Sequence, residues 1–256
     1  MTMRDDLHHV AELPDQVRRV VSLVPSLTEA IAATRPELLV GATDWCTHPA
    51  DLAVTRVRGT KNPDLNAIAQ LAPDLVVANH EENRKLDVQR LRDRGITVWV
   101  TRIDTVDDAL TSLRRLFTGP LATPYVPWLD EAEGVWSAPP RLPALTVALP
   151  IWRRPWMWVG PDTYIDDVLR RLGLRNVVTA PRYPHLDLAD VMGLRPDLVL
   201  LPDEPYAFSS EDGPDALGST HSVLVPGRAL SWYGPAMVGA REDLERRIAA
   251  TGVWAR

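Results

Sequence analysis

The sequence predicts an α/β protein made of two Rossmann-like lobes, and three observations predict it. Short apolar runs alternate with segments of helical periodicity, which is typical of parallel sheets built from βα units. A proline-rich stretch over residues 119–143 interrupts this alternation. A pattern before the interruption then recurs after it, at a constant offset of 123 residues. We therefore expect an N-terminal α/β lobe over 1–103, a connecting helical segment over 104–143 and a C-terminal α/β lobe over 144–256.

Four apolar runs in the first half are expected to be buried strands, because they are too short for ordinary helices. They cover residues 20–24, 38–42, 75–78 and 96–100. The polar segment 44–49, which follows the second run, is expected to be a loop.

Three signals place helix ends between these strands. Ser26 with Glu29 three residues later matches a capping box, so a helix is expected to start there. Asp64 can cap a second helix with its side chain. Gly95 is expected to end a helix over 84–94 in the left-handed conformation.

The remaining elements follow from the same rules. A helix is expected over 105–117, where apolar residues fall on one face. The proline-rich connector leaves room for a short helix over 128–136. The second half begins with a strand over 145–149, and Asp162 or Thr163 is expected to open the helix that follows.

The internal repeat links the two halves. The segment that starts at Asp64 and runs through LAPDLVV is echoed by one that starts at Asp187 and runs through LRPDLVL. This period is far too long for a solenoid, so it indicates two similar lobes. The repeated strand ends in acidic loop residues in each half, including Glu81 and Glu204. Strand ends of two such lobes predict a ligand cleft between them.

Composition limits the class of protein. The net charge of −6 gives no footprint for nucleic acid, and the single cysteine rules out an intrachain disulfide. The sequence contains no run of about eighteen apolar residues, the length that a membrane-spanning helix needs. The first 19 residues lack an apolar segment and a cysteine that could take a lipid, so we expect the protein to be cytoplasmic. A different start site would move this expectation to the cell envelope. We also expect the protein to be a monomer.

Several motifs resemble one known family. They read RVVSLVPSLTE over 19–29, GATDWCTHP over 41–49, NPDL over 62–65, LAPDLV over 71–76 and PDLV over 196–199. The chain resembles, over roughly residues 18–250, the class III periplasmic binding proteins. These helical-backbone metal receptors serve ABC importers of cobalamin, ferric siderophores and haem, and the cobalamin-binding branch is the most similar.

The resemblance implies two α/β lobes joined by a long helix, with the ligand held between the lobes. It implies aromatic ligand contacts at Trp45 and Trp232, and further contacts at Asn79, His80 and Glu81. The expected function is a binding protein, not an enzyme, for a bulky metal chelate such as a corrinoid, haem or ferric siderophore. No intrinsic cofactor is expected.

Departures from the family bear on the partner. Cobalamin-type members carry a glutamate on each lobe that docks on a membrane permease, and the corresponding residues here are Asn66 and Ala189. The connecting helix is also short and interrupted by prolines. The resemblance therefore leaves open whether an ABC permease is a partner, or whether the protein stores or delivers its ligand inside the cell.

Tryptophans in predicted loops are the further candidate contacts, because an indole offers a rigid apolar face and one N–H donor. They are Trp45, Trp152, Trp156, Trp158 and Trp232. Tyr233 follows the last of them and joins the candidate ligand-binding residues. The alternative is that these rings pack the lobes.

Charged and metal-binding groups have competing interpretations. Cys46, His48 and His80 carry donor atoms for a transition metal, but their spacing matches no closed site, so no metal site is expected. Arg153 and Arg154 suit a ligand carboxylate or phosphate, or form a solvated turn.

Catalysis is the alternative function. Acidic pairs at the strand ends, such as the one that includes Glu81, can act as acids and bases, and a cytosolic enzyme of cofactor metabolism can reuse this fold. The sequence shows no nucleophile–base pair, phosphate-binding glycine loop or dinucleotide fingerprint, which favours binding.

Overall fold

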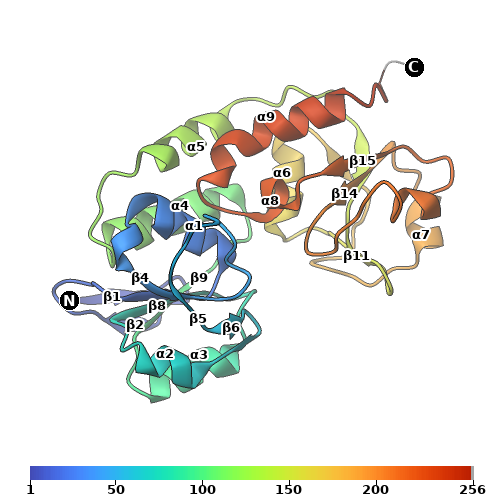
Figure 1. The fold of residues 1–256 in the computed structure, drawn as a ribbon. Helices are drawn as coiled ribbons and strands as arrows, with labels where there is room; N and C mark the ends of the chain where they lie inside the picture. The colour runs from blue at the N-terminus through green and yellow to red at the C-terminus, as the bar shows by residue number, and fades with distance from the viewer. Residues whose placement is uncertain (255–256) are drawn as a thin grey trace. The chain divides into compact units, whose positions relative to one another are not determined.

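A computed structural model describes residues 1–254, which form two compact units (Figure 1). Unit 1 comprises residues Met1–Ile103, Asp107–Asp130 and Tyr233–Pro235. Unit 2 comprises residues Asp104–Val106, Glu131–Trp232 and the described residues from Ala236 onward. The chain passes from unit 1 to unit 2 within helix α5 (Pro127–Ser137).

Unit 1 is built on a five-stranded sheet in the order β5-β4-β3-β8-β9, and every neighbouring pair is parallel. Its strands are β3 (Val20–Ser22), β4 (Leu39–Ala42), β5 (Thr55–Arg56), β8 (Leu75–Asn79) and β9 (Val98–Thr101). All five residues of β8 are buried, as is usual for a central parallel strand covered on both faces.

Helices cover both faces of this sheet (Figure 1). They are α1 (Pro25–Thr34), α2 (Leu65–Gln70), α3 (Lys85–Asp93) and α4 (Val106–Thr118), with a 3-10 turn η1 (Pro36–Leu38) after α1. One core cluster joins the sheet residues Val21 and Val76 to Ile68 of α2 and Leu91 of α3. A short hairpin of β6 (Arg58–Gly59) and β7 (Asn62–Pro63) precedes α2.

The N-terminal residues form a hairpin that the sequence did not predict. Strands β1 (Thr2–Arg4) and β2 (Val10–Glu12) pair antiparallel. The fully buried carboxylate of Asp5 pairs with Arg92 at 2.8 Å and accepts a hydrogen bond from Val100 N–H at 3.3 Å. This contact ties the hairpin to β9 and α3.

Unit 2 contains a second, separate parallel sheet of four strands in the order β13-β10-β14-β15. These are β10 (Thr146–Ala148), β13 (Arg175–Asn176), β14 (Leu198–Pro202) and β15 (Ser222–Val225), with a hairpin of β11 (Pro150–Trp152) and β12 (Met157–Trp158) beside them. Its helices are α6 (Tyr164–Arg171), α7 (Leu188–Gly193), the turn η2 (Pro214–Ala216), α8 (Gly227–Ser231) and α9 (Ala236–Ala249).

The predicted fold class is confirmed, because the repeated strands belong to two different parallel sheets. The repeat extends to the backbone of the corner before each strand. Ala72 and Arg195, which are 123 residues apart, both have positive φ angles, of 43° and 54°. Each adopts the left-handed conformation that lets the chain turn from helix into strand.

The predicted helix signals differ in outcome. The caps are confirmed at Asp64, which accepts from two backbone N–H groups of α2, and at Thr163, which accepts from one of α6. Gly95 has φ 76°, as expected. The capping-box prediction at Ser26 is wrong. Helix α1 begins at Pro25, one residue before Ser26, so its N-cap residue is Val24, which has no polar side-chain atom to cap the helix. Proline is favourable at this first helical position because it has no N–H that needs a partner.

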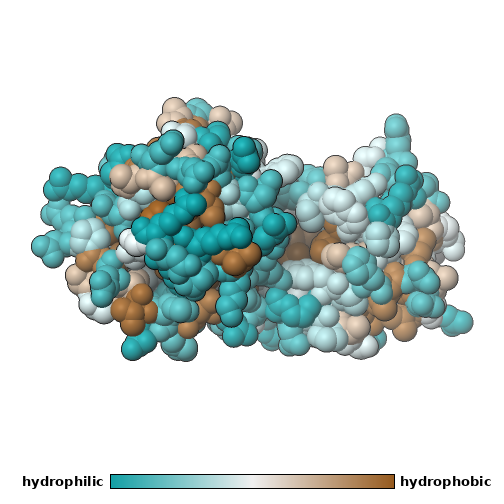
Figure 2. All heavy atoms as spheres, turned by 90° about the horizontal axis from the view of Figure 1, so that it is seen from below, coloured by the Kyte–Doolittle hydropathy of each residue, from teal (hydrophilic) through white to brown (hydrophobic). Residues whose placement is uncertain are grey.

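The face of the molecule shown in Figure 2 is mainly polar. Hydrophilic residues predominate on the face shown in Figure 2, and hydrophobic residues form separate patches there. Within residues 1–254, none of the helices is long and apolar enough to cross a membrane.

Candidate functional site

Asn79 organises the loop at the carboxyl end of β8. Its side chain is 2% exposed, so the loop covers it. Its Oδ1 accepts backbone hydrogen bonds from Glu81 at 2.8 Å and Glu82 at 3.3 Å, and its Nδ2 donates to Thr101 Oγ1 at 3.1 Å. The structure therefore gives Asn79 a role in shaping the loop that presents the neighbouring acidic residues.

His80 and Glu81 are half-buried in this loop, at the carboxyl edge of the sheet. Lys61 Nζ donates to the backbone carbonyl of Glu81 at 2.5 Å. Tyr233 packs in unit 1 and donates its hydroxyl to Glu82 at 3.3 Å. Burial raises the pKa of Tyr233 well above its usual value, so the phenol stays protonated as a donor. The structure thus brings His80, Glu81 and Tyr233 to one edge of unit 1.

Trp45 lies in the loop after β4, where 66% of its surface is exposed. The neighbouring Cys46 is fully buried beneath this loop. Its sulfur is 3.0 Å from Thr28 Oγ1 and 3.1 Å from Thr43 Oγ1, which anchors the loop to α1 and β4. An exposed indole on an anchored loop suits an apolar ligand surface.

His, Cys, Asp and Glu side chains are the usual protein ligands of metal ions. Among residues 1–254, no group of three or more His, Cys, Asp and Glu side chains is placed to hold a metal ion. Cys46 points its sulfur toward two threonines, while His48 is exposed.

Unit 2 carries a cluster of five rings at the hairpin β11–β12 and the loop after β14, here called the aromatic platform. Trp156 stacks on Trp158 at 5.5 Å and on Phe208 at 6.0 Å between ring centroids. Tyr206 contacts Phe208 at 4.7 Å, and Trp152 meets Tyr206 edge-on at 5.5 Å. Trp158 and Phe208 are buried, whereas Trp152 is 43% exposed. The platform therefore has a fixed base and an accessible edge.

An ion-pair network holds the platform in place. Arg153 is buried and forms two parallel hydrogen bonds to Asp215, at 2.9 and 2.8 Å, and a further ion pair with Asp212. Its guanidinium lies 5.5 Å from the ring centre of Trp156. The hydroxyl of Tyr206 donates to Asp212 at 2.5 Å. The hydrogen bonds from Arg153 lower the pKa of Asp215 to about 2, so this pair stays charged at neutral pH.

Trp232 differs from Trp45 in its surroundings. It is only 8% exposed, and its side chain hydrogen-bonds to the carboxyl group of Glu204. The guanidinium of Arg228 lies over its ring at 5.5 Å. Gly227 permits this packing, since a Cβ there would lie 2.4 Å from Glu204 Cγ. The structure therefore fixes Trp232 in the packing of unit 2.

The candidate residues from the sequence are thus distributed over both units. His80, Glu81 and Tyr233 meet at the edge of unit 1, and Trp152 and Arg153 meet in the aromatic platform of unit 2. That Trp45 and Trp232 face each other across a cleft stays a prediction.

Sequence analysis missed Tyr206, Phe208, Asp212 and Asp215. The alternation Tyr206-Ala207-Phe208 after an acidic strand end was the available signal for the two rings. No local pattern points from the aspartates to Arg153, about 60 residues earlier in the chain.

No family model matches the chain. It is 33% identical over 103 residues to the vitamin B12-binding protein of Pectobacterium carotovorum, which covers 40% of this chain and 37% of that protein. It is 27% identical over 220 residues to the cobalamin-binding protein of Halobacterium salinarum, covering 78% of this chain and 58% of that protein. The chain thus spans less than two thirds of the length of these curated relatives.

Solved structures match over more of the chain. The periplasmic vitamin B12 binding protein BtuF of Vibrio cholerae is similar with a TM-score of 0.72 and 18% identity, over 93% of this chain and 99% of that one. A periplasmic heme binding protein of Pseudomonas aeruginosa is similar with a TM-score of 0.75 and 21% identity, over 90% of this chain and 91% of that one.

The protein has the fold of a two-domain solute-binding protein. More narrowly, this is the class III periplasmic binding protein fold, so the resemblance found in the sequence is confirmed at the level of the fold. The two relatives and two structures named above are binding proteins rather than enzymes by their names, which agrees with the class expected from the sequence.

Proposed function

We propose that this protein binds a bulky metal chelate, with a cobalamin-like corrinoid as the first candidate and haem or a ferric siderophore as the others. The observation that carries the proposal is the aromatic platform at the carboxyl side of the unit 2 sheet. Ligands of α/β sheets bind outside the carboxyl ends of the strands, and an apolar macrocycle needs a few large apolar walls there.

The platform meets this need in two ways. A single aromatic side chain buries about 150–250 Å² when covered, so its accessible rings can supply much of the contact surface. The ion pairs of Arg153 hold the rings before any ligand arrives, and rings that are already ordered lose little entropy on binding.

The names of the relatives support the same ligand class. The relatives from Pectobacterium and Halobacterium are named for binding vitamin B12 and cobalamin, and the Pseudomonas structure for binding heme. We infer that a ligand of this class binds here.

The test is to titrate the purified protein with cyanocobalamin, haemin and ferrichrome, and to measure binding by calorimetry and by visible absorbance. We expect one of the three to bind with a dissociation constant in the micromolar range or tighter. A Trp152→Ala variant should weaken that binding, and Tyr125→Ala serves as the control because Tyr125 is exposed in the connector. Absence of binding by all three chelates contradicts the proposal.

Whether the ligand is imported through an ABC permease or kept inside the cell is a separate question from ligand binding. The positions expected to dock on a permease are exposed but uncharged here, since they hold Asn66 and Ala189. Arg94 donates a hydrogen bond to Asn66 Oδ1 at 3.0 Å, which places a cation at the first of them. We therefore propose storage or delivery of the ligand inside the cell. Cell fractionation that finds the protein in the envelope contradicts this proposal without affecting ligand binding.

A further inference from the structure

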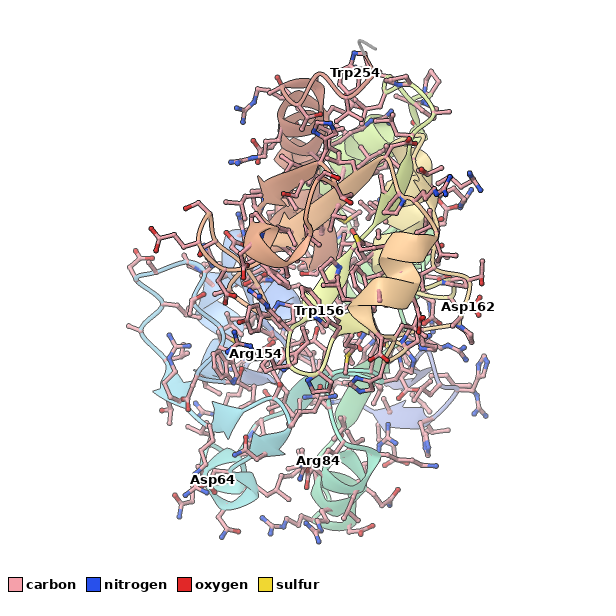
Figure 3. All side chains as sticks on the ribbon, turned by 90° about the vertical axis from the view of Figure 1, so that its right-hand side faces the viewer. Asp64, Arg84, Arg154, Trp156, Asp162 and Trp254 are labelled. Atoms are coloured by element: carbon pink, nitrogen blue, oxygen red, sulfur yellow. The ribbon has the colours of Figure 1, made fainter. Side chains whose placement is uncertain are left out.

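The two arginines of the turn between β11 and β12 have opposite environments. Arg153 is buried and paired with Asp212 and Asp215. Arg154 is exposed and makes no hydrogen bond or ion pair within residues 1–254. Figure 3 labels Arg154 and Trp156 on this turn. Two adjacent residues of one type therefore divide into an internal clamp and an external cation.

The charge balance of the platform follows from this division. Two carboxylates offset the guanidinium of Arg153, so it has little charge left to offer a ligand. The charge of Arg154 is not offset by an ion pair. It acts on the ring next to it: the hydrogen bond to Asp212 raises the pKa of Tyr206, and the charges of Arg154 and Arg153 oppose that rise. Arg154 follows Trp152, the exposed ring of the platform, by two residues in the turn that joins β11 to β12.

The backbone limits where this cation can point. Arg154 has a φ angle of 78°, in the left-handed region that favours glycine. The turn is fixed on both sides of Arg154, because the preceding Arg153 is clamped by two aspartates and Trp156, two residues further on, is stacked on the platform. The turn therefore presents the Arg154 side chain from a rigid position.

We propose that Arg154 is the ligand-contacting cation of the aromatic platform, and that Arg153 is a positioning residue that acts through the rings. Guanidinium groups bind carboxylates and phosphates with paired, charge-assisted hydrogen bonds. The ligand class that fits is an apolar ring system with an anionic substituent at its edge. This inference rests on the proposed function and adds to it the charge of the ligand.

Pairs of probes that differ in the anionic group test the proposal. Haemin, which carries carboxylates, is compared with haemin dimethyl ester, and cyanocobalamin, which carries a phosphate, with dicyanocobinamide, which lacks it. The variants are Arg154→Ala, Arg153→Ala and Arg195→Ala. Arg195 is the matched control, because it is also exposed in unit 2, precedes a proline and has a positive φ of 54°.

We expect Arg154→Ala to weaken the anionic member of the bound pair about tenfold and to leave the other member unchanged. Arg153→Ala should weaken both members equally, and Arg195→Ala neither. The identity of the affected pair tells a carboxylate from a phosphate. Equal weakening of both members by Arg154→Ala, or weakening of neither, overturns the inference while the proposed function stands. If the wild type binds none of the four probes, the proposed function fails and the inference fails with it.

Discussion

Asp74 and Asp197, which lie 123 residues apart, make corresponding contacts in the two units. The carboxylate of Asp74 accepts hydrogen bonds from the backbone N–H groups of Arg18 and Arg19 at 2.8 and 2.9 Å. The carboxylate of Asp197 accepts from the N–H and the hydroxyl of Thr146 at 2.7 and 2.6 Å. Each aspartate therefore joins the beginnings of two paired strands, β8 to β3 and β14 to β10.

We expect Asp197→Ala to lower the free energy of unfolding of unit 2 by about 1–3 kcal/mol, because it removes charge-assisted hydrogen bonds and leaves a strand N–H without its partner. Asp74→Ala should do the same to unit 1. Hydrogen exchange followed by mass spectrometry assigns each loss to its sheet. Asp190→Ala is the control, since Asp190 is an exposed aspartate on α7. Exchange in Asp197→Ala that matches this control contradicts the prediction.

The contribution of Asp197 should depend on pH. The hydrogen bonds from the Thr146 hydroxyl and N–H lower the pKa of Asp197 in the folded protein. A carboxyl group with a lowered folded pKa stabilises the protein above its unfolded pKa of about 3.9, and this stabilisation is lost as the pH falls through the folded pKa. The difference in the free energy of urea unfolding between the wild type and Asp197→Ala should therefore be largest at pH 7 and should shrink below about pH 4. A difference of the same size at both pH values contradicts this account.

Cys46 should be unreactive in the native protein. Burial raises the pKa of its thiol, against the opposing hydrogen bonds of Thr28 and Thr43, so the thiolate is scarce and inaccessible. We expect Ellman's reagent at pH 8 to label it only as fast as the protein opens, and at once in denaturant. A Ser210→Cys variant provides an exposed thiol in the same protein. If Cys46 and the thiol introduced at position 210 are labelled at equal rates in the native protein, the prediction that Cys46 is inaccessible is wrong.

The central strands and the Pro-Asp corners were predictable from the sequence because their signals are local. A buried parallel strand such as β8 is a continuous apolar run, and a cap such as Asp64 acts on the next few residues. The N-terminal hairpin escaped prediction for the opposite reason. Its strands have three residues each, and Asp5 is held by Arg92, 87 residues away.

The site was predictable only in part. The residue types identified Trp152 and Arg153 as candidates. They did not show whether Arg153 contacts the ligand or instead holds the aromatic rings in place. That division depends on Asp212 and Asp215, which reach Arg153 from a loop about 60 residues away. Burial similarly distinguishes Trp232, which packs against Glu204, from exposed Trp45.

The N-terminal hairpin should contribute to the stability of unit 1. Asp5→Ala leaves the cation of Arg92 without its buried partner and also removes an acceptor for the backbone N–H of His9 at 2.8 Å. Loss of one member of a buried pair costs about 3–5 kcal/mol, so we expect a large fall in the midpoint of urea unfolding. Asp15→Ala is the matched control on the exposed surface. If the two variants unfold at similar urea concentrations, the Asp5 contacts of the hairpin do not contribute to the stability of unit 1.

Three tryptophan variants separate ligand contact from packing. Trp45 is exposed, so Trp45→Ala should leave thermal unfolding unchanged and weaken the bound chelate about ten- to a hundredfold, the loss expected when a ligand covers an indole. Trp128 donates to Thr34 Oγ1 at 2.9 Å and meets Phe117 edge-on, so Trp128→Ala should reduce stability and leave affinity unchanged.

Trp232→Ala should reduce both stability and affinity. It removes a buried ring from unit 2, at a cost of about 3–5 kcal/mol, and it also removes the predicted ligand contact. Trp232→Phe distinguishes the two effects. It keeps most of the apolar ring and loses the hydrogen bond to Glu204, so stability should fall less than in Trp232→Ala. Calorimetric titration with the chelate that the wild type binds, at a temperature where all four variants are folded, gives the affinities. If all of them bind it as tightly as the wild type, neither Trp45 nor Trp232 contacts the ligand, and the predicted grip from two sides is wrong.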